Sequence, residues 1–154
     1  MGSSRQYCTF TVHDLFCGLD VLEVQEVMRE QPMTRVPLAP PAIRGLINLR
    51  GQIVVALDLR RRLGLPEGAP DQSRINVVVR TEEGAVSLMA DDVDEVIEVS
   101  DDAFEHAPTT LSAATRELVS GVCKLEGRLL MILDLDKLLN LPPEADDLAS
   151  PRSS

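Results

Sequence analysis

The residues best suited to chemistry form a run of carboxylates in the second half of the chain. Seven acidic residues fall within twelve positions, namely Asp91, Asp92, Asp94, Glu95, Glu98, Asp101 and Asp102. Clustered carboxylate oxygens are the ligands that Mg²⁺ and Ca²⁺ prefer. The run lacks the glycine of an EF-hand loop, and apolar residues interrupt its ligand positions, so a solvated acidic face is the favoured interpretation. A metal-binding enzyme that uses Asp91, Asp92, Asp94 and Glu95 is the alternative hypothesis.

The other reactive side chains do not form a catalytic arrangement in the sequence. His13 and His106 lie in separate polar turns without a nucleophile at a suitable spacing, and no glycine-rich phosphate loop occurs. Cys8, Cys17 and Cys123 are odd in number, far apart and set in apolar segments, which predicts buried, reduced thiols in a cytoplasmic protein. We therefore expect no enzymatic activity, no metal site and no cofactor.

The charge of the chain narrows the choice of partners. The net charge is −10 and the isoelectric point is about 4.6, which argues against nucleic acid as a partner. The charge is uneven: residues 1–80 hold ten arginines and eight acids, or +2, whereas residues 81–154 hold five bases and seventeen acids, or −12. This asymmetry suits end-to-end assembly or binding to two different partners. The alternative explanation is that the acidic residues only make the protein more soluble. No apolar run is long enough to cross a bilayer, so we expect no direct membrane insertion.

The element that organises the chain is a hairpin with its following turn of helix, residues 45–66, and it occurs twice. Residues 121–142 align with it without gaps at an offset of 76 positions, and nine of the pairs are identical. Each copy has apolar residues on successive positions, which predicts a central hairpin covered on both faces. The turns differ in charge, since Arg50 aligns with Glu126. We therefore look for function at this turn.

The remaining segments read mostly as strands. Residues 7–12, 15–18, 75–79, 86–90 and 93–99 are predicted strands, and a short helix is expected where Asp20 can cap the chain. Val21, Val24 and Val27 line one side at a spacing of three, either as core or as the lining of an exposed groove. Residues 64–73 are the expected subdomain boundary, and residues 100–114 an expected loop. Arg60, Arg61 and Arg62 are expected on a solvated face.

The chain resembles the CheW chemotaxis coupling protein family over roughly residues 5–141. The motifs that carry the resemblance are residues 24–27 (VQEV), 34–37 (TRVP), 45–51 (GLINLRG), 57–60 (LDLR), 90–93 (ADDV) and 125–130 (LEGRLL). The resemblance implies an all-β fold: two five-stranded SH3-like β-barrel subdomains in a pseudo-two-fold arrangement, with short helices and a C-terminal helix. Subdomain 1 would cover about 5–70 and subdomain 2 about 71–141, followed by a disordered tail over 142–154. Ala56 and Ser87 depart from the family pattern, where proline and glycine are usual.

The resemblance also implies a function and a site. A CheW-like protein is a non-catalytic adaptor between the cytoplasmic helical tip of a chemoreceptor and the regulatory domain of a CheA-type histidine kinase. It would be cytoplasmic and associated with receptor arrays through these partners. A stand-alone regulatory module of another two-component pathway is a further alternative. The residues that the resemblance assigns to partner binding are Val21, Val24, Val27 and Val93, as the lining of a receptor groove, and Glu26 and Arg50, as a pair that stabilises the turn or meets a partner.

Overall fold

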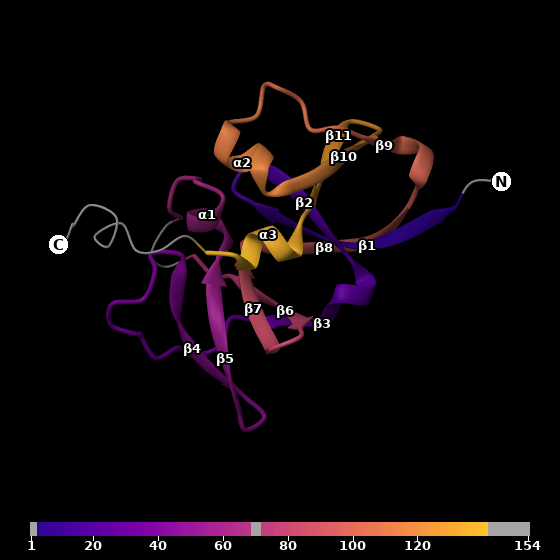
Figure 1. Ribbon diagram of the computed structural model, residues 1–154. Helices are drawn as coiled ribbons and strands as arrows, with labels where there is room; N and C mark the ends of the chain where they lie inside the picture. The colour runs from indigo at the N-terminus through magenta and orange to yellow at the C-terminus, as the bar shows by residue number, and fades with distance from the viewer. Residues whose placement is uncertain (1–2, 69–71, 142–154) are drawn as a thin grey trace.

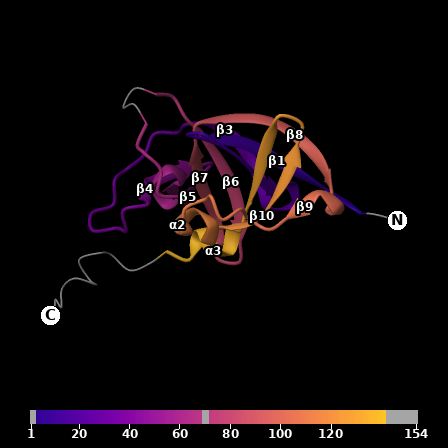
Figure 2. The same ribbon diagram turned by 90° about the horizontal axis from the view of Figure 1, so that it is seen from above.

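The computed structural model describes residues 3–68 and 72–141, which form two β-sheets with short helices between them (Figures 1 and 2). The strands are β1 (Ser4–Val12), β2 (Leu15–Asp20), β3 (Val24–Arg29), β4 (Ile43–Leu49), β5 (Gln52–Asp58), β6 (Ile75–Thr81), β7 (Gly84–Ala90), β8 (Asp92–Ser100), β9 (Phe104–Glu105), β10 (Val119–Leu125) and β11 (Arg128–Leu133). The helices are α1 (Leu59–Arg62), α2 (Ala113–Glu117), α3 (Leu135–Leu139) and the 3₁₀ turns η1 (Val21–Glu23) and η2 (Asp101–Ala103). The predicted all-β class, short helices and C-terminal helix are confirmed. The tail over 142–154 lies outside the described residues.

The two sheets are built on one plan. One has the strand order β3-β6-β7-β5-β4, and the other has the order β8-β1-β2-β11-β10, extended by β9. The repeated hairpins occupy matching places, since β4–β5–α1 in one unit corresponds to β10–β11–α3 in the other. In both units the second strand of the repeat pairs in parallel with a neighbouring hairpin: β5 with β7, and β11 with β2. The duplication inferred from the sequence is therefore present in space as a pair of equivalent β-units.

Each sheet combines strands from both halves of the chain: the hairpin β1–β2 lies in the sheet of β8, β10 and β11, and the hairpin β6–β7 lies in the sheet of β3, β4 and β5. After the hairpin β1–β2, the chain passes through η1 and β3 pairs with β6 in the other sheet. After β6–β7, the chain returns and β8 pairs with β1. The predicted boundary near residue 70 therefore does not coincide with the division between the sheets. The Asp20 carboxylate accepts a hydrogen bond from the Leu22 amide, and this cap turns the chain towards the second sheet.

Successive residues of the central strands point into different apolar clusters. On β5, Leu57 packs into a core shared by both sheets, α1 and α3, whereas Val54 and Ala56 pack into a cluster inside their own unit. On β11, Met131 and Leu133 likewise belong to the shared core, and Leu130 and Ile132, which alternate with them, belong to a third cluster. Side chains alternate across a strand, so a strand covered on both faces must be apolar throughout. This explains the unbroken apolar runs of the repeats.

The first glycine of each repeat is required by a close approach of another segment. A Cβ at Gly45 would lie 2.5 Å from the Thr34 carbonyl oxygen, and one at Gly121 would lie 2.2 Å from the Phe104 ring. Thr34 and Leu46 exchange two backbone hydrogen bonds of 2.8 Å, and β9 pairs with β10 beside Gly121. The segment over 100–114, predicted to be a loop, therefore contains η2 and β9 because β10 offers it an edge to pair with.

The cysteines take the positions expected of core residues. Cys17 and Cys123 are buried, Cys8 is half-buried, and all three are free thiols. Burial raises the pKa of Cys17 to about 12. Burial likewise raises the pKa values of Cys8 and Cys123. These thiols therefore contribute to packing as small apolar groups.

Candidate partner-binding surface

The first repeat presents Arg50 at the tip of a hairpin that projects from the body of the molecule (Figure 1). Arg50 and Gly51 both have positive φ, +53° and +88°, as the two central residues of a type I′ turn require. The Asn48 side chain accepts a hydrogen bond of 2.9 Å from the Gly51 amide. The Arg50 side chain is 74% exposed. The turn therefore holds a charged side chain away from the two sheets.

Arg50 forms a bidentate ion pair with Glu26 on β3. Arg50 Nη1 lies 2.5 Å from Glu26 Oε1, and Nη2 lies 2.9 Å from Oε2. These hydrogen bonds lower the pKa of Glu26 and raise that of Arg50. Since β3 and β4 are the two edges of the five-stranded sheet, the pair joins its ends and helps to close the unit. Of the two roles inferred for this pair, the stabilising contact is formed, and contact with a partner stays a prediction.

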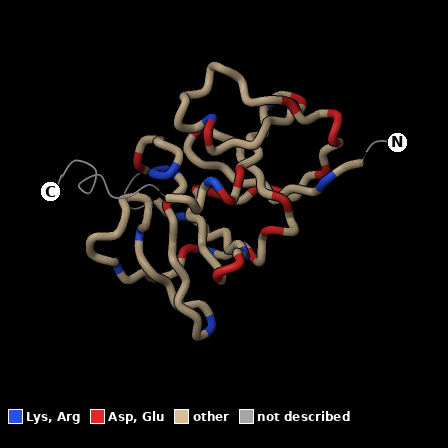
Figure 3. The backbone as a smooth tube through the Cα atoms, viewed as in Figure 1, with Lys and Arg blue, Asp and Glu red and all other residues tan. Residues whose placement is uncertain are grey.

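The second repeat makes the corresponding connection with a different arginine. Its turn carries Glu126, and Arg128 reaches the crossing strand instead, with Nη2 3.6 Å from Asp94 Oδ2 on β8. The same guanidinium lies 3.5 Å from the centroid of the Phe16 ring. In the second repeat the arginine that contacts the crossing strand therefore lies two positions after the place that aligns with Arg50, and that place is taken by Glu126. Figure 3 shows acidic residues gathered around β8 and η2, and a basic residue at the tip of the β4–β5 hairpin.

The predicted groove valines lie on the two strands that change sheets. Val24 and Val27 on β3 are half-buried against the shared core, and Val21 in η1 is half-exposed. Val93 on β8 is 45% exposed. Val24 pairs with Val79 and Val93 with Phe10, which are equivalent places in the two units. The stripe is thus not sealed in the core, and its use as a receptor groove stays a prediction.

Two exposed apolar residues next to these valines were not found by sequence reasoning. Leu22 in η1 is 86% exposed and Val96 on β8 is 52% exposed. Val96 and Val93 pair with Cys8 and Phe10, and the register shift between these pairs, which the sequence does not reveal, brings two residues at a spacing of three to one face. Leu22 lies between two predicted residues, but its direction depends on the 3₁₀ turn, which the sequence did not specify. Both enlarge the apolar surface around the predicted site.

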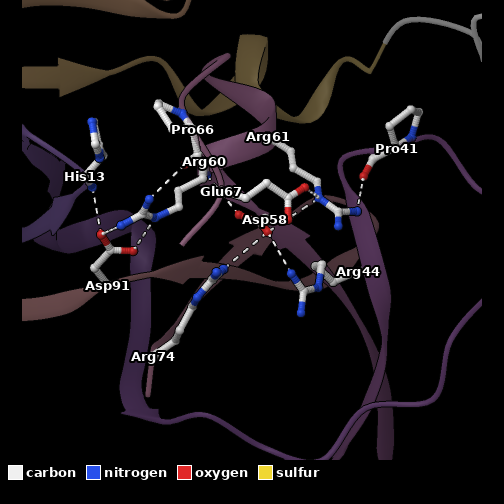
Figure 4. Close-up of polar contacts among 10 residues, drawn as sticks. All are labelled: His13, Pro41, Arg44, Asp58, Arg60, Arg61, Pro66, Glu67, Arg74 and Asp91. Atoms are coloured by element: carbon white, nitrogen blue, oxygen red, sulfur yellow. Dashed lines mark hydrogen bonds and ion pairs between the residues drawn. The ribbon is translucent and has the colours of Figure 1, made fainter. Parts of the chain in front are cut away.

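The structure separates the carboxylates of the alternative metal site. Both oxygens of Asp91 accept hydrogen bonds from Arg60, at 2.9 Å from Nε and 2.6 Å from Nη2, and the amide of His13 donates at 2.7 Å (Figure 4). Burial acts to raise the pKa of Asp91, but these donors outweigh it and lower the pKa. Within residues 3–68 and 72–141, no three His, Cys, Asp or Glu side chains lie close enough to hold a metal ion. The set Asp91, Asp92, Asp94 and Glu95 therefore does not form the proposed ligand cluster.

The expectation that Arg60, Arg61 and Arg62 lie on a solvated face is wrong for Arg60, whereas Arg61 is exposed and Arg62 is half-exposed. Arg60 is 7% exposed and bound to Asp91. Arg62 donates to the Lys137 and Leu138 carbonyls at 2.8 Å and to the Asn140 carbonyl at 3.1 Å, which satisfies the C-terminal end of α3. A triplet of arginines gives no sign of burial in the sequence, because the Asp91 carboxylate lies 31 positions from Arg60 and the α3 carbonyls lie 75 or more positions from Arg62.

A second buried polar group centres on Asp58, which sequence reasoning also missed. Asp58 is 1% exposed and caps α1 by accepting from the Arg60 amide at 2.9 Å. Its other oxygen lies 3.2 Å from Nη1 of both Arg44 and Arg74, and 3.8 Å from Nε of Arg61 (Figure 4). The identity of Asp58 with Asp134 in the second repeat was an available signal, since Asp134 caps α3 in the same way. The surrounding arginines have no such signal.

The fold and these contacts define a class of protein. It consists of two equivalent β-units, its buried polar groups connect elements of the structure, and its candidate site is a surface that can bind a partner. A model of the CheW-like domain matches residues 6–142. The chain is 34% identical to the chemotaxis protein CheW of Bacillus subtilis over 90% of this chain and 88% of that protein. It is 30% identical to the CheW protein of Rhizobium meliloti over 87% and 86% of the two chains.

A solved structure agrees with these relatives. The scaffolding protein TtCheW from Thermoanaerobacter tengcongensis superposes with a TM-score of 0.81 at 26% identity, over 92% of this chain and 97% of that one. The chain therefore belongs to the CheW-like domain family. Among the described residues, no helix is both long enough and apolar enough to cross a membrane.

Proposed function

We propose that this protein is a non-catalytic adaptor that couples a chemoreceptor to a CheA-type histidine kinase. The observation that carries the proposal is the match of the CheW-like domain to residues 6–142, almost the whole described chain. The relatives are named chemotaxis proteins, and the similar solved structure is described as a scaffolding protein. The proposed partners are the cytoplasmic helical tip of the receptor and the regulatory domain of the kinase. The protein would be cytoplasmic and held at receptor arrays through them.

The receptor tip would dock on the apolar side chains of η1, β3 and β8. Val21, Val24 and Val27 lie together on η1 and β3, and Val93 occupies the equivalent place to Val24 on β8. Burial of a few hundred Å² of apolar surface is worth several kcal/mol at about 25 cal/mol per Å², before the costs of association. An amphipathic helix suits such a site because it presents apolar residues at a spacing of three and four. The contact would be modest in strength, as assembly through many linked contacts requires.

Arg50 would add a charged contact at the edge of this surface. Its guanidinium is held by Glu26, so its position is fixed before a partner arrives, and it remains largely exposed. A partner carboxylate can approach the outer face of such a pair at little cost in side-chain entropy. The proposed role is therefore recognition by a side chain that the fold has already oriented.

The test is the substitution Arg50→Glu, which gives the first turn the charge of the second. We expect weaker co-sedimentation with receptor tips and kinase and an unchanged circular dichroism spectrum. The matched control is Glu126→Arg, which changes the equivalent turn of the other unit. Unchanged binding by R50E would refute the role of Arg50.

A charge-swapped variant, Glu26→Arg with Arg50→Glu, separates the two roles of the pair. It can restore the ion pair but reverses its outward charge. Recovery of binding in this variant would mean that the pair acts only by closing the barrel. Continued loss would mean that Arg50 itself meets the partner.

A further inference from the structure

We propose that the arginines around Asp58 form a recognition pocket for an acidic segment of a partner protein, on a different surface from the receptor groove. The pocket is a hollow of about 1210 Å³ between the segment after β3, the start of β4, α1 and the start of β6. Four of the ten arginines in residues 1–80 line it, namely Arg35, Arg44, Arg61 and Arg74. None of these residues belongs to the proposed receptor site.

The charge of the pocket differs from that of the whole chain. Its charged lining residues are these four arginines with Glu30 and Glu67, and Arg44 and Arg74 also contact the buried Asp58 carboxylate, so cations outnumber anions here in a protein of net charge −10. Glu67 is engaged by Arg61, with Nε 3.0 Å from Oε2. Arg44 and Arg74 instead share a single oxygen of Asp58. Two guanidinium groups, those of Arg44 and Arg74, therefore share one carboxylate oxygen.

The hydrogen-bonding capacity of Arg44 and Arg74 that the described residues leave unused also favours binding of a carboxylate. A guanidinium has five N–H donors, and a buried donor without an acceptor is costly. The Arg74 side chain is only 7% exposed, yet within the described part of the chain its guanidinium makes one hydrogen bond, of 3.2 Å to Asp58. Arg44 likewise makes one within the described residues, and its side chain is 29% exposed (Figure 4 shows the contact with Asp58). Among the described residues each of these guanidiniums has one acceptor, and an arriving carboxylate would supply more.

The rim of the pocket favours a peptide segment over a free ion. The segment after β3 brings Val36, 36% exposed, and Leu38, 87% exposed, to the hollow. Leu38 has φ +64°, a conformation that is unfavourable for a residue other than glycine and that clusters at ligand-binding sites. A free anion makes no use of an apolar rim. A segment with a carboxylate beside an aliphatic side chain would use both the arginines and the rim.

The experiment is a titration of the full-length ¹⁵N-labelled chain with a short capped peptide of alternating glutamate and leucine. We expect amide shifts centred on Met33, Ile43 and Arg44, which weaken as salt is raised. The variants are Arg44→Gln and Arg35→Gln, and the matched control is Arg80→Gln, an exposed arginine that does not line the pocket. We expect R44Q to weaken binding about tenfold or more, because a charge-assisted hydrogen bond is lost, and R80Q to leave it unchanged.

Further arms identify the source of the ligand. Peptides of alternating glutamine and leucine should not bind. Citrate or inorganic phosphate that binds as tightly as the glutamate peptide would overturn the proposal in favour of a free-anion site. Equal loss in R80Q would show nonspecific attraction, and no shifts at all would also overturn it. Asp71 lies three positions before Arg74 in the sequence. Binding of the glutamate peptide to D71N but not to the unchanged chain would show that the chain's own carboxylate takes the place of the peptide, and it would overturn the proposal of a partner segment. If R44Q does not fold, R35Q provides the same test, since Arg35 is exposed.

Discussion

Removing the Asp91 carboxylate should destabilise the protein by an amount typical of a broken buried ion pair. The substitution is Asp91→Asn, which keeps the shape of the side chain and removes its charge. The Arg60 and Asp91 side chains are only 9% and 11% exposed. Loss of one partner of a buried pair leaves the other charge buried alone and costs about 3–5 kcal/mol. We expect about 3 kcal/mol, the lower end, because both side chains keep some contact with water.

The position of Asp91 in the fold explains why the whole protein should respond. Asp91 stands between β7 and β8, where the chain leaves one sheet for the other. Its backbone amide donates to the Thr11 carbonyl at 2.9 Å, and its carboxylate accepts from His13 in the β1–β2 turn and from Arg60 in α1. One carboxylate therefore ties a helix of one unit to a turn of the other. Its loss should lower the midpoint of a single cooperative transition.

The assay is urea unfolding followed by circular dichroism at neutral pH. Glu67→Gln is the control, because Glu67 is 63% exposed and its pair with Arg61 is a surface contact, expected to change stability by no more than about 0.5 kcal/mol. The double variant Arg60→Met, Asp91→Asn should lose less than the sum of the single variants, since no charge is left without a partner. A loss below about 1 kcal/mol in D91N, or strict additivity in the double variant, would refute the reasoning.

The pH dependence gives an independent check on the same residue. The pKa of Asp91 is lower in the folded protein than its ordinary value of about 3.9. A depressed pKa contributes stability that is fully present above the unfolded value and is lost as pH falls through the folded value. The difference in stability between the wild type and D91N should therefore be constant from about pH 5 upward and should shrink below about pH 4. A difference that persists unchanged in acid would contradict an ionic origin.

Three further predictions follow from other contacts. Gly45→Ala should lower stability by more than about 1 kcal/mol, measured by thermal unfolding, because its Cβ would lie 2.5 Å from the Thr34 carbonyl oxygen; a neutral effect would mean that the Thr34 segment moves freely. The Cys17 thiol, with a pKa of about 12, should resist iodoacetamide at pH 8 in the folded protein, measured by mass spectrometry, and rapid labelling would contradict its burial. Arg62→Gln should speed hydrogen exchange in α3, because three carbonyls at its C-terminal end lose a hydrogen bond from the guanidinium; unchanged exchange would show that these contacts do not hold the helix.

The architecture was predictable where local pattern determines it. The repeated hairpins followed from apolar runs, turn glycines and a fixed offset, and both formed as expected. The exchange of β3 and β8 between the sheets was not predictable in this way. Neither strand carries a local signal for the sheet it joins, and the crossings between the sheets lie at η1 and at Asp91. The contacts of Asp91 join segments that lie far apart in the chain.

The residues of the candidate site also differ in how well they could be predicted from the sequence. Glu26 and Arg50 were expected as a pair from the resemblance to a family, and they do form one. The buried arginines were missed, because Arg60 and Asp91 are 31 positions apart and Asp58 and Arg74 are 16 apart. A charged residue is predicted to be exposed unless the residue that forms an ion pair with it can be identified in the sequence. The partner of Arg60 is placed where the chain crosses between the sheets at Asp91, so that pair depends on the same long-range arrangement as the path of β8.

The exchange of strands also bears on how an adaptor of this kind can respond to its partners. β3 is hydrogen-bonded to β6 in one sheet but is joined through η1 to β2 in the other, and β8 has the reciprocal arrangement. The predicted groove residues Val24 and Val93 lie on these two strands. A helix that displaced either strand would therefore act on both units, through backbone hydrogen bonds on one side and the covalent chain on the other. Arg60 and Arg62 oppose such movement, since each ties α1 of one unit to elements of the other half of the chain. Partners bound at the proposed groove and at the arginine pocket would thus bind to one mechanically connected body, although the two surfaces share no residue.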